Sequence, residues 1–136
     1  MPTIIENRRN LHQIPEIELT TQKTAQYIEN ILDLYDCTID HPIPNSVTAF
    51  FDNKKEKTIV FRSDMDALPM EENTNLTFKS TNGCMHACGH DGHMAMVLEL
   101  AKYAKESDYN VLLLFQPGEE KPGGAKPIIE SKFFDK

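Results

Sequence analysis

The sequence predicts a three-layer α/β domain, in which helices cover both faces of a central sheet. Helical patterns alternate with short apolar strand patterns along the chain. Residues 111–115 form an uninterrupted apolar run, which is typical of a central strand buried on both faces. The 136 residues contain no repeat and no interdomain linker, so we expect one core and one domain over residues 1–136.

Two helices are predicted in the N-terminal part of the chain. Residues 4–11 form the first helix, which stops near Pro15. Residues 20–34 form the second, because their apolar residues recur at helical spacing, namely Ala25, Ile28, Ile31 and Leu32. Either Thr20 or Thr21 is suited to cap the start of this second helix.

A β-hairpin is predicted in the next segment. Residues 47–51 and 58–61 are apolar, β-branched or aromatic, and a polar turn at residues 52–55 separates them. Two such runs around a short polar connection favour a pair of antiparallel strands that are adjacent in the sheet.

The second half of the chain predicts a helix, a strand and another short helix. Residues 91–105 carry apolar side chains on one helical face. The buried strand at residues 111–115 follows, and a break at residues 122–124 precedes a last short helical segment.

The composition excludes several classes of partner. The net charge is -7 and no basic stripe is present, which argues against nucleic acid or an anionic membrane as partner. No stretch approaches the ~20 apolar residues of a membrane span, and the N-terminus shows no secretory signal. We therefore expect a cytoplasmic protein whose three cysteines are thiols, some of them available as metal ligands.

Two clusters of polar residues stand beside apolar segments. Residues 84–93 hold two of the three cysteines, three of the five histidines and a carboxylate, in the order Cys84, His86, Cys88, His90, Asp91 and His93. Glu119 and Glu120 follow the apolar run at 111–115. Each cluster alone is more often an ordinary loop or a solvated surface. Together, at the ends of apolar segments, they indicate a metal-dependent hydrolase, in which some residues hold the ion and a free carboxylate moves protons.

A third cluster leaves the strand predicted at residues 58–61. Arg62, Asp64 and Asp66 follow it directly, and the two aspartates share one face if the strand continues. Alone, this pattern favours a turn in which both carboxylates accept bonds from backbone amides. Beside a metal site, one carboxylate can instead orient a histidine ligand, and Arg62 can stabilise ionised Asp64.

Four motifs, at residues 9–16, 61–69, 85–93 and 115–120, resemble in order and spacing the amidohydrolase branch of the metal-dependent aminoacylase and carboxypeptidase superfamily. That branch includes hippurate hydrolases, plant auxin-conjugate hydrolases and N-acetyldiaminopimelate deacetylases. The run that begins at Glu119 is most similar to the deacetylases. The resemblance implies the N-terminal part of a zinc-peptidase-like catalytic domain that hydrolyses the amide bond of N-acyl amino acids, as in lysine and diaminopimelate biosynthesis.

The resemblance also implies the roles of individual residues. Two divalent ions, zinc or manganese, are expected, with Cys88, His90 and Glu120 as ligands. Glu119 matches the general base, although the roles of the two glutamates are exchanged in some descriptions of the family. The remaining candidates are an active-site aspartate, Asp64 with Asp66 as the competing choice, and two supporting histidines, His86 and His93.

The sequence departs from this family in length. Family members are far longer and supply further histidine ligands after the glutamate pair, whereas no histidine follows His93 here. The lid domain through which the family dimerises is absent from these residues. We therefore expect residues 1–136 alone to hydrolyse the small-molecule substrate poorly and to expose an apolar strand edge.

Two other classes of function stay open at this stage. The first is a hydrolase with Cys88 or Cys84 as nucleophile, which would ignore chelators. The second is a non-catalytic module in which Cys84, Cys88 and histidines close around one structural metal ion.

Overall fold

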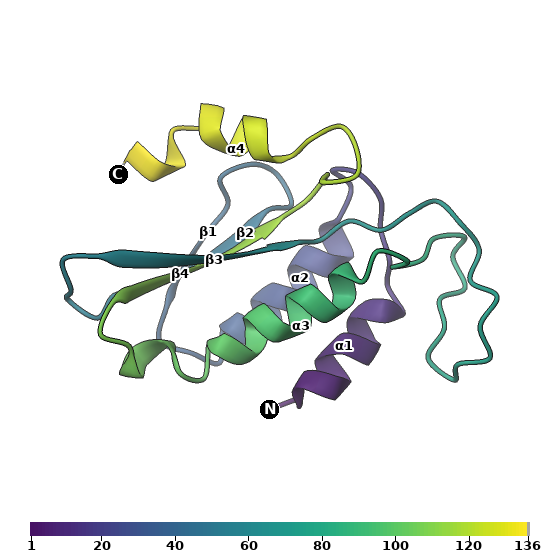
Figure 1. The fold of residues 1–136 in the computed structure, drawn as a ribbon, viewed down its shortest axis with the longest axis horizontal. Coiled ribbons are helices and arrows are strands. Elements are labelled where there is room, and N and C mark those ends of the chain that lie inside the picture. The colour runs from purple at the N-terminus through teal and green to yellow at the C-terminus, as the bar shows by residue number, and fades with distance from the viewer. Residues whose placement is uncertain (136) are drawn as a thin grey trace.

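The computed structural model describes residues 1–135, which fold around one mixed four-stranded sheet (Figure 1). The strands are β1 (Thr38–Asp40), β2 (Val47–Phe51), β3 (Thr58–Asp64) and β4 (Asn110–Gln116). The α-helices are α1 (Ile4–His12), α2 (Gln22–Leu32), α3 (His90–Leu100) and α4 (Ala125–Glu130). Two short 3₁₀ helices complete these elements, η1 (Ala104–Glu106) and η2 (Phe133–Asp135).

The strand order is β1-β2-β4-β3, so the predicted hairpin is wrong. β4 lies between β2, to which it is antiparallel, and β3, to which it is parallel. All seven residues of β4 are buried, and a strand apolar on both faces gains most from this central position. The short strand β1, which we did not predict, pairs with the outer side of β2.

The polar connection between β2 and β3 does not join two strands that are adjacent in the sheet. It passes the start of β4, which lies between them. The Asn53 N–H donates to Asn110 Oδ1 at 3.0 Å, and its side-chain amide donates to the carbonyls of Ala104 and Tyr109 at 2.7 and 2.8 Å. These bonds hold the connection under the N-terminal end of β4. β3 therefore begins on the far side of β4.

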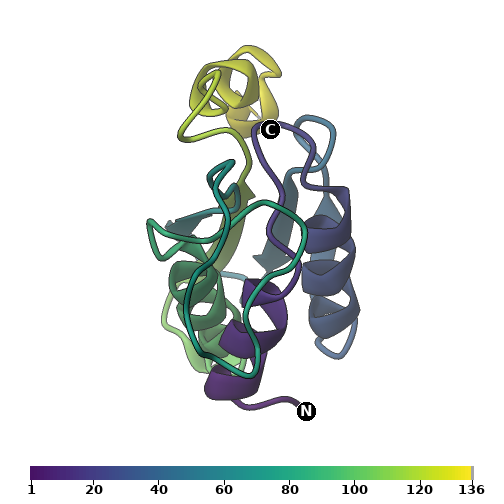
Figure 2. The ribbon, with the colours of Figure 1, turned by 90° about the vertical axis from the view of Figure 1, so that its right-hand side faces the viewer.

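Helices lie on both faces of the sheet, which confirms the three-layer α/β fold. α1, α2 and α3 lie on one side, and α4 with η2 lies on the other (Figures 1 and 2). The core fills the space under the first three helices. Alternate residues of the two inner strands supply its sheet side, namely Val47, Ala49, Phe51, Val111, Leu113 and Phe115.

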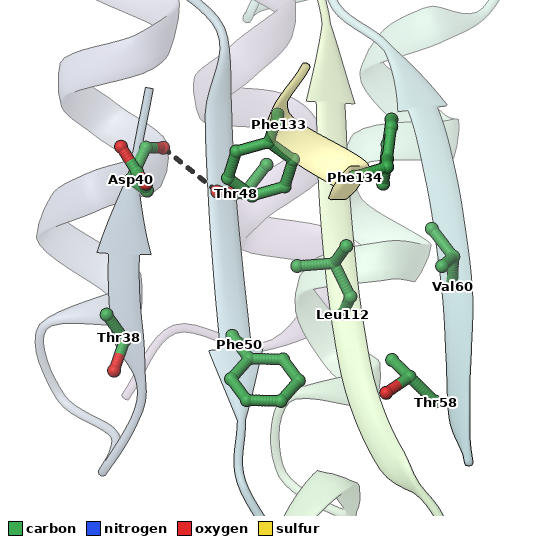
Figure 3. Close-up of a pocket in the computed structure, with 9 residues that line it drawn as sticks. All are labelled: Thr38, Asp40, Thr48, Phe50, Thr58, Val60, Leu112, Phe133 and Phe134. Atoms are coloured by element: carbon green, nitrogen blue, oxygen red, sulfur yellow. Dashed lines mark hydrogen bonds between the residues drawn. The ribbon is translucent and has the colours of Figure 1, made fainter. Parts of the chain in front are cut away.

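The opposite face is covered more sparsely. Here Phe133 and Phe134 line a cavity of about 480 Å³ together with strand residues that include Phe50 and Leu112 (Figure 3). β3 forms one edge of the sheet, and its residues Ile59, Val60 and Phe61 are 37 to 46% exposed. The expected apolar strand edge is therefore present in residues 1–135.

Local sequence explains how the first two helices begin. Thr3 and Glu6 form a reciprocal capping box at α1. Thr21 is the N-cap residue of α2, one of the two positions predicted, but its side chain makes no capping hydrogen bond. The carboxylate of Glu16 replaces it and accepts from the N–H groups of Lys23 and Thr24 at 3.1 and 2.9 Å.

The third helix is shorter than predicted. The pattern predicted residues 91–105, whereas α3 ends at Leu100 and the chain continues in tight turns to η1. The N–H groups of Ala101 and Tyr103 donate three residues back, to the carbonyls of Leu98 and Leu100. These are 3₁₀-type bonds, so the apolar periodicity continues after the α-helix has ended.

A long loop between β3 and α3 is held by polar contacts. The bridge between Leu68 and Met85 closes a loop of residues 69–84, called here the Ω-loop. Its Glu72 carboxylate lies 3.0 Å from Nε2 of His12 in α1 and accepts from the Ser80 N–H at 2.7 Å. The Ω-loop is thereby fixed to the first helix, in front of which it lies in Figure 2.

No helix within residues 1–135 is long and apolar enough to cross a membrane.

We predict an acid-dependent stability that traces to Glu72. Burial alone would raise the pKa of Glu72, but bonds from Thr74, His12 and Ser80 lower it from 4.5 to about 2. The ionised carboxylate therefore stabilises the fold above pH 4.5, and this contribution disappears as the pH falls toward 2. Glu72→Gln should lower the melting temperature at about pH 6, and its difference from wild type should shrink by about pH 3.

The control for this measurement is Glu56→Gln, which changes an exposed glutamate. It should melt close to wild type across the same pH range. A difference between Glu72→Gln and wild type that stays constant with pH would contradict the assignment.

Candidate functional site

The polar clusters predicted from the sequence meet at one end of the sheet. β3 ends at Asp64 and runs parallel to β4, whose last residue Gln116 is its register partner. The chain after β4 carries Glu119 and Glu120, and α3 begins at His90 beside these strand ends (Figure 1). Ligand sites of α/β folds lie at the carboxyl ends of parallel strands, and this site follows that rule.

The carboxylate of Asp66 organises the turn after β4. It is fully buried and accepts from the N–H of Glu119 and from the N–H of Glu120, both at 2.9 Å. β3 has already ended at Asp64, so the two aspartates do not share a strand face. The side chain of Asp66 therefore binds backbone N–H groups in the interior, while Asp64 lies at the end of the strand.

Gly118 allows the chain to make this turn. Its φ of 73° lies in the left-handed region, and a Cβ atom there would lie 2.7 Å from Leu19 Cδ2. The carbonyl of Gly118 also accepts from the N–H groups of Gly123 and Gly124, at 2.9 and 3.0 Å. The glycine thus permits the tight turn that presents the two glutamates.

His90 is held in one tautomer. Its Nδ1 lies 2.8 Å from the carbonyl oxygen of Asp66. A carbonyl only accepts, so Nδ1 carries a proton, and Nε2 is the nitrogen whose lone pair a neutral ring offers. The ring is buried, and Nε2 lies 3.8 Å from Glu119 Oε2. This is the arrangement of a metal-ligating histidine whose second nitrogen is anchored.

The structure brings three candidate ligands together. Asp64, His90 and Glu119 each offer one ligand atom, and these atoms lie within 4.8 Å of one another. Asp64 also accepts a hydrogen bond from Arg62, the contact that the sequence suggested. Glu119 is exposed, so one side of this group of ligand atoms is open.

Cys88 and Glu120, the other two proposed ligands, are not part of this set of three, and Cys88 is exposed. The pKa of the Cys88 thiol is raised, first by its hydrogen bond to Glu120 and then by burial. The negative charges of Glu120, Glu119 and Asp66 raise this pKa further. The raised pKa favours the protonated thiol in this structure.

These residues fit a divalent metal ion. A thiol, an imidazole and several carboxylates are the donor types that zinc and similar ions take. Negative charge is concentrated around Cys88 and raises the pKa of its thiol. The same negative charge would stabilise a bound cation. Cation binding favours the thiolate, so proton release and metal binding are coupled here.

The other histidines of the segment lie outside the set of three candidate ligands. His86 is buried, and neither ring nitrogen has a hydrogen-bond partner. Burial lowers the pKa of His86 to about 4, even though the charge of Asp91 opposes this shift. His93 is exposed, with its ring centroid 5.8 Å from that of His90. Cys84 is half-buried, and its carbonyl accepts from Ser80 Oγ.

Sequence reasoning missed a buried polar chain behind the site. His12 contacts both Asp91 and Glu72, and Arg8 contacts Asp91. His12 and Asp91 belong to two of the motifs singled out in the sequence, but nothing in the sequence indicated that they touch. Glu72 lies in the irregular Ω-loop and carried no sequence signal.

Comparisons with known proteins agree with this geometry. The family described as Peptidase family M20/M25/M40 matches residues 60–136, which is more than half of the chain. A Staphylococcus epidermidis protein named an uncharacterized hydrolase is 41% identical over 137 residues, covering 96% of this chain. The match spans 36% of the length of that relative.

Two crystal structures share the fold. One, from methicillin-resistant Staphylococcus aureus, has a TM-score of 0.91 and 41% identity, covering 98% of this chain and 36% of its own. The other, the Bacillus subtilis YXEP protein, is described as a dinuclear metal-binding peptidase of the M20 family. It has a TM-score of 0.88 and 34% identity, covering 97% of this chain and 39% of its own. The chain therefore belongs to Peptidase family M20/M25/M40, a family of hydrolases.

Proposed function

We propose that the whole protein hydrolyses the amide bond of N-acyl amino acids with the help of divalent metal ions. The observation that carries this proposal is the convergence of Asp64, His90 and Glu119 within 4.8 Å at the carboxyl end of β3 and β4. The description of the Bacillus subtilis relative as a dinuclear metal-binding peptidase supports it. The chain spans 36% of the length of the Staphylococcus epidermidis relative. The hydrolytic activity is therefore proposed for the whole protein.

The proposal assigns a role to each donor. Cys88, His90 and Glu120 would hold the metal, as the family resemblance implied, and a bound divalent ion would supply hydroxide at neutral pH and would polarise the amide carbonyl. Asp64 offers a carboxylate oxygen within 4.8 Å of a ring nitrogen of His90, and we assign it the role of the active-site aspartate. Asp66 positions Glu119 and Glu120 through their N–H groups and does not touch substrate.

Glu119 is proposed as the general base. Its carboxylate is exposed on the open side of the ligand set, whereas Glu120 is half-buried and raises the pKa of the Cys88 thiol. The Glu119 carboxylate lies 3.8 Å from Nε2 of His90, beyond hydrogen-bond distance. It is therefore available to take the proton of the attacking water and to give it to the leaving amine.

The substrate class is a finer proposal. The run from Glu119 to Ala125 resembles the N-acetyldiaminopimelate deacetylases, so we propose an N-acetylated diamino acid as substrate. A hippurate-type substrate is the alternative. Comparing release of acetate from N-acetyldiaminopimelate with release of benzoate from hippurate distinguishes the two.

The acidic surroundings of Cys88 argue against a role for this cysteine as the nucleophile. A nucleophilic cysteine needs a lowered pKa, while the acidic groups around Cys88 raise its pKa. The rival with a closed Cys84–Cys88 metal site is tested by the substitutions below.

We predict that metal binding depends on Cys88 and not on Cys84. Cys88→Ala removes a proposed ligand, so bound zinc per chain should fall toward the background of a chelator-treated sample. Cys84→Ala should bind zinc like wild type, because Cys84 has no assigned role in the site. The measurement is the zinc content after dialysis, with circular dichroism to show that both variants fold. Equal losses from the two substitutions would favour the closed Cys84–Cys88 site.

We also predict that Glu119→Gln separates metal binding from turnover. The suitable protein is a chimera in which this chain replaces the matching segment of the Staphylococcus epidermidis relative, which supplies the remaining length. Glu119→Gln should keep the metal and lower kcat by about a hundred- to ten-thousand-fold, because an amide cannot accept the water proton.

The matched variant for this test is Glu120→Gln. It should lose metal first and activity as a consequence. If Glu119→Gln stayed near wild-type activity while Glu120→Gln kept its metal and lost turnover, the roles of the two glutamates would be the reverse of those proposed.

A further inference from the structure

His12 of α1 is buried between two carboxylates that come from different parts of the chain. Its Nδ1 lies 2.7 Å from Asp91 Oδ2, and its Nε2 lies 3.0 Å from Glu72 Oε1. The ring is 2% exposed, and neither carboxylate side chain exceeds 1%. Each ring nitrogen therefore faces a carboxylate oxygen, and a ring that carries a proton on both nitrogens donates to both acids.

Each of these carboxylates lies next to a part of the proposed metal site. Asp91 directly follows His90 in the first turn of α3, and Arg8 also donates to it, from Nε at 2.9 Å. Glu72 lies in the Ω-loop, and the residues that carry Cys88 follow the Leu68–Met85 bridge at the base of that loop. His12 therefore connects the start of α3 with the Ω-loop, which precedes α3 in the chain.

The segment that carries Cys88 has no helix or strand of its own. Between β3 and α3, at residues 65–89, the chain is held by isolated bridges and side-chain bonds. The bonds to Glu72 are the ones that reach α1, and Phe78 of the same loop adds an edge contact to the His12 ring, at 5.7 Å between centroids. The loop also lies against α1 in Figure 2.

We propose that His12 is a positioning residue of the metal site. It fixes the loop segment that carries Cys88 relative to the helix start that carries His90, by way of Glu72 and Asp91. This role rests on the proposed metal-dependent function. An imidazole donates from two opposite sides of a rigid ring, which a single amide side chain cannot reproduce, so the position requires histidine.

The experiment compares His12→Gln with Asn7→Ala. Asn7 is a buried polar residue of the same helix, but its Oδ1 accepts from Tyr27 of α2 and not from the site. Both substitutions remove a buried polar contact of α1. Cobalt(II) is the probe, because its near-ultraviolet charge-transfer band reports the bond to the Cys88 thiolate and its titration reports affinity.

His12→Gln should weaken cobalt binding by about ten- to hundred-fold, as loss of an outer-shell partner does, and should diminish the thiolate band. Asn7→Ala should keep both the affinity and the band. Amide hydrogen exchange without metal should be faster in residues 69–93 of His12→Gln. In Asn7→Ala, exchange should be faster in α1 and α2 instead. Glu72→Gln weakens the same link from the loop side, so it should lower cobalt affinity and the thiolate band as His12→Gln does. It serves as the test variant if His12→Gln does not fold.

Three results would overturn the proposal. Cobalt binding and the thiolate band could be unchanged in His12→Gln, or they could be lost equally in Asn7→Ala, which would show a general loss of stability. In both of these cases the wild-type chain binds cobalt through Cys88, so the metal-dependent function stands. The third result is a wild-type chain without the thiolate band, which would overturn the metal ligand assignment and the role of His12 with it.

Discussion

The buried carboxylate of Asp66 is the constraint on which the rest of the site depends. Its two oxygens accept hydrogen bonds from the N–H groups of Glu119 and Glu120, and the backbone carbonyl of Asp66 accepts a hydrogen bond from Nδ1 of His90. One residue therefore sets the turn after β4 and the tautomer of the histidine at the start of α3. A buried carboxylate requires such partners, because an unpaired charge in the interior is strongly unfavourable.

The sheet explains why these residues meet at one end. β4 is apolar on both faces and takes the centre, and β3 runs parallel to it, so both strands end on the same side. The polar residues that follow them face each other there, and α3 brings His90 to the same place. The resulting acidic cluster raises the pKa of Cys88, and the same charge favours a bound cation.

The sequence predicted the features that depend on local pattern. The structure contains the buried strand predicted at residues 111–115 and the helices predicted near residues 4–11 and 20–34. It also contains the polar clusters that the sequence placed beside apolar segments. The hairpin prediction was wrong because adjacency in the chain does not decide which strand pairs with β4. The link from His12 to Glu72 joins residues 60 positions apart, through a loop without periodicity, and no local pattern reports such a contact. The different parts played by Asp64 and Asp66 depend on β3 ending at Asp64, and strand ends are poorly defined by sequence.

The central claim is that Cys88 and His90 hold a metal ion at the ends of β3 and β4. X-ray absorption at the zinc edge of the zinc-loaded chain tests it most directly, because sulfur ligands at ~2.3 Å separate clearly from nitrogen and oxygen ligands at ~2.0–2.2 Å. The account predicts one sulfur in the ligand shell of wild type and none in Cys88→Ala. A shell with two sulfurs, or a wild-type shell of nitrogen and oxygen alone, would contradict it.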